Sequence, residues 1–195
     1  MLKVGLTGGI GSGKTLVCSV LEKLGVAVYF ADSEARRLMN NDQDLVVQIS
    51  EIFGKKAYEG GSLNREFLAQ GVFKDQKLLT RLNELVHPAV QKDFARWASE
   101  QKPAPYVVEE AAILFESGSD RNMDLTVGVF AEKELRIKRV IQRDGIKREE
   151  VLKRISSQMN EKEKMEKVDL VIHNNGKLMI LPQIINMHNA ILKRG

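Results

Sequence analysis

The 195-residue chain is poor in the residues that cross-link small proteins or carry them to a membrane. It has one cysteine, Cys18, which allows no internal disulfide and no cysteine-based metal cluster. No uncharged apolar stretch is long enough to cross a bilayer, and the first residues lack the basic and apolar regions of a secretory signal. We therefore expect a cytoplasmic protein without a membrane partner.

Aromatic residues are also scarce, at 6% of the chain, and most of the sequence has no excess charge. Segment 132–167 holds 12 Lys/Arg and 8 Asp/Glu, an excess of four that equals the net charge of the whole chain, +4. A basic segment suits nucleic acid or a phosphate-rich ligand, and the alternative is a solvated helical face. Phe130 is the one aromatic residue nearby, so base stacking is poorly supported and we expect no nucleic-acid partner.

Short runs of apolar residues alternate with helical patterns along the chain. The runs predict strands at Val4–Thr7, Val26–Phe30, Tyr106–Ile113, Leu125–Phe130 and Val168–Ile172. The helical patterns cover residues 14–24, 32–40, 45–53, 64–73, 75–86, 132–143, 148–158 and about 181–191, with 54–62 as a turn-rich loop. Pro88 breaks or restarts the pattern, and helix is expected to resume to about Glu100. Apolar strands separated by helices indicate a five-stranded parallel sheet covered on both faces, a three-layer α/β fold.

The strongest motif is GGIGSGKT, which begins at Gly8 and fits G-x-x-x-x-G-K-[ST]. A predicted strand precedes it and a predicted helix follows it, as a phosphate-binding loop requires. Glycines let the backbone wrap around phosphate oxygens, Lys14 can reach the β- and γ-phosphates, and the Thr15 hydroxyl can ligate Mg²⁺. The residues expected to hold ATP are Gly8, Gly9, Gly11, Ser12, Gly13, Lys14, Thr15 and Leu16.

A phosphate loop predicts nucleoside triphosphate binding but does not choose the reaction. The guanine-reading N-K-x-D of GTPases and the L-S-G-G-Q-like signature of transporter ATPases are both missing from the sequence. The small size, the helical insertion after the second strand and the basic late segment favour a kinase with a substrate-binding domain and a lid.

Asp32 follows the second predicted strand, in YFADSEARR. Ligands of α/β sheets lie beyond the carboxyl ends of the strands, so Asp32 should face the phosphate loop. A carboxylate there can orient an attacking hydroxyl and accept its proton. The alternative is a helix N-cap, since a helical run begins at this point.

Arg139 and Arg143 lie four residues apart in the basic segment and share a helix face. Arginines of a closing lid can stabilise the charge on a transferring phosphoryl group and exclude water. The alternative is exposed charge that serves solubility.

Taken together, the motifs resemble the dephospho-coenzyme A kinase family. GLTGGIGSGKT, FADSEARR, LNREFLAQGVF, VHPAV, AAILFESG, IQRDGIKREE, RISSQM and VIHNNG occur in family order, from Leu2 to about Gly176. The resemblance implies transfer of the ATP γ-phosphate to the 3′-hydroxyl of the ribose in dephospho-coenzyme A, the last step of coenzyme A biosynthesis. It also implies a P-loop core at 1–31, 101–142 and 164–195, a helical acceptor-binding domain at 32–100 and a lid at 143–163.

The resemblance assigns roles to single residues as well. It makes Asp32 the acceptor-activating carboxylate, places Arg65 and His87 near the acceptor, and places Asn174 near adenine. Lys14, Arg139 and Arg143 stabilise the transferring phosphoryl. Arg65 could instead be an ion-pair partner, and His87 could cap a helix.

The chain departs from the family pattern in three places. Phe30 replaces the first aspartate of D-A-D, Leu16 follows Thr15 where Ser-Thr is usual, and Ala112 replaces a proline. Two rival functions follow from the motifs: a kinase for another nucleotide-like acceptor, or a nucleotide-binding regulator without transfer activity. The oligomeric state has no signature in the sequence.

Overall fold

The computed structural model describes residues 1–194, so Gly195, the last residue of the predicted core, lies outside the described residues. The elements along the chain are β1 (Leu2–Thr7), α1 (Lys14–Lys23), β2 (Ala27–Phe30), α2 (Ala31–Asn41), α3 (Gln43–Phe53), η1 (Lys55–Ala57), β3 (Tyr58–Glu59), β4 (Ser62–Leu63), α4 (Arg65–Lys74), α5 (Gln76–Glu100), β5 (Tyr106–Glu110), η2 (Ser119–Asn122), β6 (Leu125–Phe130), α6 (Lys133–Asp144), α7 (Arg148–Ser156), α8 (Glu161–Lys167), β7 (Leu170–His173) and α9 (Ile180–Leu192). Among the described helices, none is both long and apolar enough to span a bilayer.

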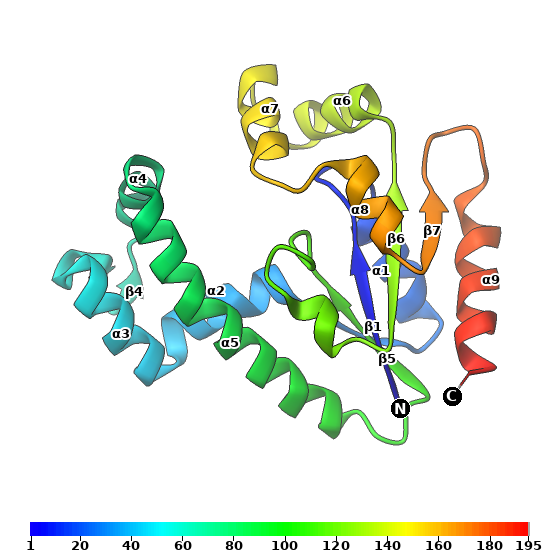
Figure 1. The fold of residues 1–195 in the computed structure, drawn as a ribbon, viewed down its shortest axis with the longest axis horizontal. Helices are drawn as coiled ribbons and strands as arrows, with labels where there is room; N and C mark the ends of the chain where they lie inside the picture. Colours follow the sequence, from blue (N-terminus) through cyan, green and yellow to red (C-terminus); the bar gives the residue numbers. More distant parts are fainter. Residues whose placement is uncertain (195) are drawn as a thin grey trace. The chain divides into compact units, whose positions relative to one another are not determined.

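The described chain separates into two compact units. The first unit contains Met1–Phe30 and the described residues from Ala98 onward, and the second contains Ala31–Trp97. The first unit is built on a five-stranded parallel sheet in the order β2-β5-β1-β6-β7, which confirms the predicted fold class. Figure 1 shows α6 and α7 beyond the arrowheads of β1 and β6, so these two helices lie at the carboxyl edge of the sheet.

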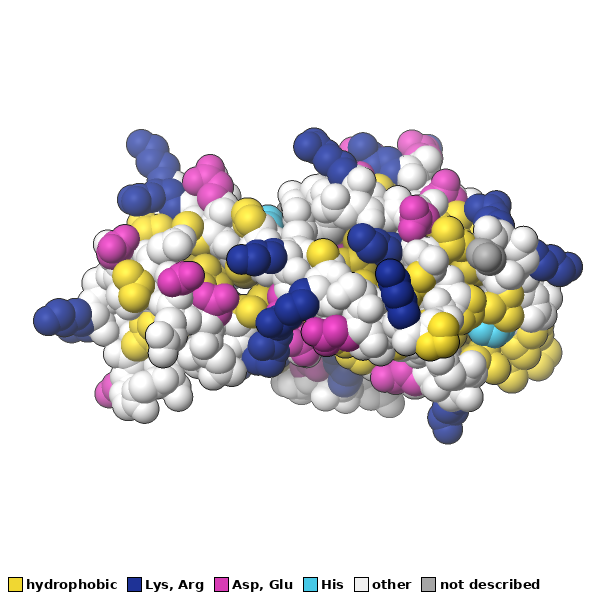
Figure 2. All heavy atoms as spheres, turned by 90° about the horizontal axis from the view of Figure 1, so that it is seen from below, with side chains coloured by type: hydrophobic (Ala, Val, Ile, Leu, Met, Phe, Trp, Pro, Cys, Tyr) yellow, Lys and Arg dark blue, Asp and Glu magenta, His cyan; other side chains and the backbone are white. Residues whose placement is uncertain are grey.

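One face of the sheet is covered by α1 and α9. Their buried side chains, Val17, Cys18 and Leu21 from α1 and Ile184, Met187 and Ile191 from α9, form one core with the strands. The outer side of α9 keeps several exposed apolar side chains, and Figure 2 shows hydrophobic atoms gathered where this helix lies. The predicted final helix is confirmed, but Leu181 and Ile185 of its predicted apolar face are exposed. His188 Nδ1 lies 2.7 Å from the Tyr106 hydroxyl, within hydrogen-bond distance.

The other face is covered closely by the loop after β5 and by α8. A Cβ at Gly5 would lie 2.7 Å from a Leu114 methyl carbon, and a Cβ at Gly128 would lie 2.6 Å from the Met165 sulfur. Because real Cβ atoms do not approach that closely, these two strand glycines let the covering segments pack against the sheet. The sheet is thus the middle of three layers.

The second unit contains α2 to α5 and a small β3–β4 hairpin. The hairpin is tied to the end of α2: the Tyr58 hydroxyl donates to the Met39 carbonyl at 2.7 Å, and the Leu63 amide donates to Asn40 Oδ1 at 2.9 Å. The sequence predicted only a turn-rich loop at 54–62, because two-residue strands leave no period to detect.

Two further sequence predictions were wrong at the level of elements. The helix was predicted to break at Pro88, but α5 runs through it from Gln76 to Glu100. Val86, Val90 and Phe94 are buried on one side of the helix, and this packing continues across the proline. The helix α8 was not predicted, because its sequence EKEKMEK has no apolar stripe.

Candidate active site at the phosphate loop

The phosphate loop runs from the end of β1 to the first turn of α1. Gly8, Gly11 and Gly13 have φ of 148°, 79° and 101°, values that residues with a side chain rarely adopt. Gly13 is the N-cap of α1 and leaves the first amides of the helix without a side-chain cap. Within residues 1–194, the amides of Gly13, Lys14 and Thr15 donate to no protein acceptor. Free amides at a helix N-terminus form an anion-binding cradle.

Lys14 lies beside this cradle and is mostly buried. Its Nζ donates to the Gly8 carbonyl at 3.0 Å and lies 3.4 Å from Glu110 Oε1. Glu110 is the last residue of β5 and lies opposite Leu6 of the neighbouring strand β1. The sequence analysis missed Glu110 because it predicted this strand to continue to Ile113, whereas β5 ends at Glu110.

Arg139 and Asn174, two of the predicted site residues, contact the same loop. The Asn174 side-chain amide donates to the Ser12 carbonyl at 2.8 Å, and Arg139 Nη2 donates to the Asn174 carbonyl at 3.0 Å. Arg139 Nη1 also lies 3.5 Å from the carbonyl oxygens of Gly11 and Ser12. A Cβ at Gly13 would overlap the Asn174 side chain, so this contact requires the glycine.

Arg143 is not part of this cluster. It is exposed at the end of α6, where its Nε donates to Asp144 Oδ1 at 2.6 Å. The hydrogen bonds from Arg143 hold the pKa of the Asp144 carboxyl below its usual range. Arg154 reaches the same aspartate at 3.2 Å, so these two arginines are placed to share one acidic partner.

The apex of the loop, Gly9 and Ile10, is held by side chains that the sequence analysis did not select. They are Arg136 of α6, Gln158 after α7 and Glu161 of α8. Arg136 carried a signal that could have been used: it lies on the apolar face of its helix with Ile137 and Val140, and it is 3% exposed. Gln158 stands in the family motif RISSQM, which could have drawn attention to it. Glu161 carried no signal, since its partner lies about 150 positions earlier in the sequence.

The other predicted site residues belong to the second unit. Asp32 comes two residues after β2, lies in the first turn of α2 and is exposed. Since α2 begins at Ala31, Asp32 is not its N-cap, and that alternative is wrong. Arg65 is the first residue of α4, is exposed and, within the described chain, makes no ion pair. The interpretation of Arg65 as an ion-pair partner therefore finds no support.

His87 lies inside α5 rather than at a helix end, so it does not cap a helix. Its imidazole is half-buried, and burial lowers its pKa below the ordinary value. The ring is therefore neutral near pH 7, with one nitrogen able to donate and the other able to accept.

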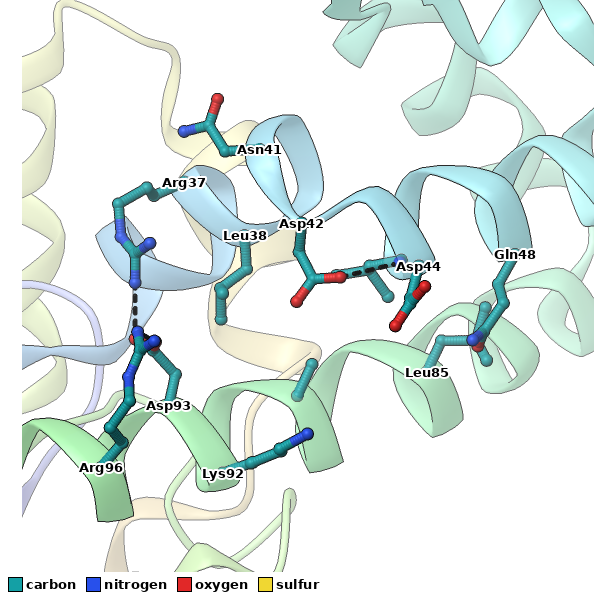
Figure 3. Close-up of a pocket in the computed structure, with 12 residues that line it drawn as sticks. Arg37, Leu38, Asn41, Asp42, Asp44, Gln48, Leu85, Lys92, Asp93 and Arg96 are labelled. Carbon is teal, nitrogen blue, oxygen red and sulfur yellow. Dashed lines mark hydrogen bonds and ion pairs between the residues drawn. The ribbon is translucent and has the colours of Figure 1, made fainter.

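The second unit also holds a cavity of about 470 Å³ between α2, α3 and α5. Figure 3 shows Arg37 and Arg96 directed at Asp93, while Asp42 caps α3. The side chains that line the cavity do not include Asp32, Arg65 or His87. The cavity is therefore not formed by the predicted acceptor-binding residues.

Comparisons with known proteins agree with these features. The family model described as dephospho-CoA kinase matches residues 2–179. A dephospho-CoA kinase of Salinibacter ruber is 42% identical over 181 residues, which cover 91% of this chain and 91% of the relative. One from Bacteroides fragilis is 37% identical over 186 residues, covering 95% and 91%.

Among solved structures, a Thermus thermophilus protein, TT1252, matches with a TM-score of 0.84 and 35% identity, covering 99% of this chain and 97% of the other.

Proposed function

The chain belongs to the dephospho-CoA kinase family, and we propose how its residues carry that family's reaction, transfer of the ATP γ-phosphate to the ribose 3′-hydroxyl of dephospho-coenzyme A. The observation that carries the proposal is the cradle of free amides at Gly13, Lys14 and Thr15, with the Lys14 ammonium beside it. These groups bind the phosphates of ATP, and Lys14 stabilises the charge that develops on the transferred phosphoryl group.

Mg²⁺ is the metal that this donor set suits. The Thr15 side chain is exposed at the start of α1, and Glu110 offers a carboxylate at the end of the neighbouring strand. Mg²⁺ prefers hard oxygen ligands and usually keeps several waters beside one or two protein oxygens and the phosphates. The Thr15 hydroxyl is proposed as a ligand and Glu110 as an acceptor for metal-bound water, and the ion supplies charge neutralisation on the phosphates.

Asp32 is proposed as the base that orients the acceptor hydroxyl and accepts its proton. Its support is its position along the chain, two residues beyond the carboxyl end of β2, together with its exposure. The strands β2, β5 and β1 are parallel neighbours, so β2 ends at the same sheet edge as the strand that leads into the phosphate loop.

Roles for the remaining predicted residues follow from their surroundings. Arg139 lies against the phosphate loop and Asn174, so its charge supports bound phosphates while Asn174 borders the adenine side. Arg143 is proposed to leave Asp144 and join the phosphates when the 143–163 segment closes over the nucleotide. Arg65 and His87 are proposed to contact the acceptor in the 32–100 domain. A cytoplasmic location also stays a prediction.

The test is an acceptor panel with purified protein. ADP release is measured with dephospho-CoA, a nucleoside monophosphate and no acceptor, for wild type, Asp32→Asn and the control Asp44→Asn, an exposed acid of α3. We expect release that depends on dephospho-CoA, with kcat reduced by about a hundredfold or more in Asp32→Asn and unchanged in the control.

Three results would contradict the proposal. Preference for another acceptor would identify a different substrate. ATP binding without acceptor-dependent ADP release would indicate a nucleotide-binding regulator. Normal turnover of Asp32→Asn would show that Asp32 is not the base.

A further inference from the structure

Ile10, at the apex of the phosphate loop, is held through its backbone and its side chain by late segments of the chain. Its amide donates to Gln158 Oε1 at 3.0 Å, and its carbonyl accepts from Arg136 Nε at 3.0 Å. Its side chain packs against a buried cluster of α6 and α7 that includes Ile137, Val140 and Val151. The apex is therefore part of the α6–α8 packing rather than a free turn.

Gly9 is held by a carboxylate. Its amide lies 3.1 and 3.3 Å from the two Glu161 oxygens, and Glu161 Oε2 pairs with Arg136 Nη1 at 2.5 Å. Hydrogen bonds to an ionised acceptor in a largely buried place are stronger than neutral ones. A Cβ at Gly9 would overlap both Arg136 and Glu161, so any other residue here would displace these two side chains from the loop.

Glu161 is itself held in place from two sides. It begins α8, and the N-cap of that helix, Asn160, accepts from the Lys162 amide at 2.9 Å. One turn later the buried Lys164 donates to the Ala112 carbonyl at 2.7 Å and pairs with Glu116 at 3.0 Å. This anchors α8 to the loop after β5, and Glu161 is presented to the phosphate loop from a fixed position.

The two halves of the loop thus have different partners. The apex amides of Gly9 and Ile10 donate to Glu161 and Gln158, while the amides at the start of α1 remain for phosphate. We propose that Gln158 and Glu161 are positioning residues, which act through Ile10 and Gly9 to keep the phosphate loop in the form that binds the ATP phosphates. This inference rests on the proposed function for its ligand, ATP.

A positioning role predicts a selective kinetic effect. Loosening the apex weakens ATP binding, because part of the binding energy is then spent on ordering the loop. It leaves the KM for the acceptor unchanged, since the two side chains act on the phosphate loop and the predicted acceptor residues belong to the other unit. A role in general packing would affect both substrates alike.

The experiment uses the full chain with Gln158→Ala, Glu161→Gln and the control Glu163→Gln. Glu163 lies in the same first turn of α8, is exposed and undergoes the same charge change. Affinity for ATP with Mg²⁺ is measured by calorimetry, KM values for ATP and dephospho-CoA by ADP release, and folding by circular dichroism. Gln158→Ala leaves no buried charge unpaired, so it tests the proposal if Glu161→Gln folds poorly.

We expect ATP affinity to fall about five- to tenfold in Gln158→Ala and Glu161→Gln, because each variant loses one hydrogen bond or one charge pair. The control and the KM for dephospho-CoA stay within twofold of wild type. ATP affinity within twofold of wild type in both variants overturns the proposal, as does an equal rise in both KM values. If wild type binds ATP but does not phosphorylate dephospho-CoA, the proposed acceptor is refuted instead. The ATP affinities of the variants and wild type then still decide the positioning role.

Discussion

Glu109 is a buried acid without a partner, one residue before the proposed metal-side carboxylate. It is 1% exposed in the middle of the sheet, between Gly5 and Tyr29 on the neighbouring strands. Neither of its carboxylate oxygens has a hydrogen-bond partner among the described residues. Burial raises its pKa to about 7 from the ordinary 4.5. The folded protein therefore holds a proton here that the unfolded chain releases above about pH 4.5.

A neutral replacement of Glu109 should stabilise the protein at alkaline pH. Because the folded-state pKa of Glu109 is raised, ionising this buried acid destabilises the folded state. This destabilisation grows as pH rises from about 4.5 through about 7, and it is complete above that value. We expect Glu109→Gln to increase the free energy of unfolding by up to about 3 kcal/mol at pH 8. Urea titrations at pH 8 and pH 4.5 test this, with the exposed Glu22→Gln as control. An equal change in the free energy of unfolding at both pH values would refute the proposed titration of Glu109.

Lys14 is a proposed catalytic side chain whose removal should spare the fold. Lys14→Ala removes the ammonium beside the amide cradle, and we expect kcat/KM for ATP to fall by about a hundredfold or more. Lys23→Ala, an exposed lysine in the last turn of the same helix, should behave as wild type. Steady-state ADP release with circular dichroism as a fold check makes the comparison. Turnover of Lys14→Ala near that of the control would remove Lys14 from the reaction.

At the scale of elements, α8 depends on one buried lysine. The Lys164 ammonium is fully buried and reaches the Ala112 carbonyl and Glu116, which also accepts from the Met159 amide at 2.7 Å. The sequence of α8 supplies no apolar stripe, so this polar anchor, Met165 and the ion pair of Glu161 with Arg136 hold the helix in place.

Lys164→Met should therefore loosen α8 more than a single substitution would be expected to loosen so short a helix. Removing one partner of a buried pair costs about 3 kcal/mol, and about 2 is expected here because Glu116 is partly exposed. Urea unfolding gives the stability, and hydrogen exchange shows whether the α8 amides lose protection. Lys162→Met, on the exposed side of the helix, is the control. A loss no larger than that of the control would show that the anchor is not needed.

At the scale of the whole molecule, nucleotide binding should be visible in thermal unfolding. A ligand at about a hundred times its dissociation constant stabilises the folded state by about 2.7 kcal/mol, which raises Tm by roughly 5–11 °C for a chain of this size. We expect this shift with ATP and Mg²⁺, and its loss in Lys14→Ala. Thermal scans with ATP, with ATP plus a chelator and without nucleotide test it. An undiminished shift in Lys14→Ala would place the nucleotide elsewhere.

The fold class and the phosphate loop follow from the sequence because both are local. Apolar strands followed by helices dictate a parallel sheet, and glycines at positions of positive φ next to Lys14 and Thr15 dictate the cradle. Asp32 was likewise selected from its position directly after a strand, and its role as the base stays a prediction. Pro88 and the 54–62 hairpin were misjudged because packing across a helix face and side-chain contacts to α2 outweigh local preference.

The surroundings of the loop were decided only by the tertiary structure. Glu110 reaches Lys14 because two strands far apart in sequence are neighbours in the sheet, and Gln158 and Glu161 reach the apex because α6 to α8 fold back over the strand ends. No periodicity links residue 9 to residue 161. A contact of that kind comes from the sheet order and the anchoring of α8, which are properties of the folded chain and not of any stretch of its sequence.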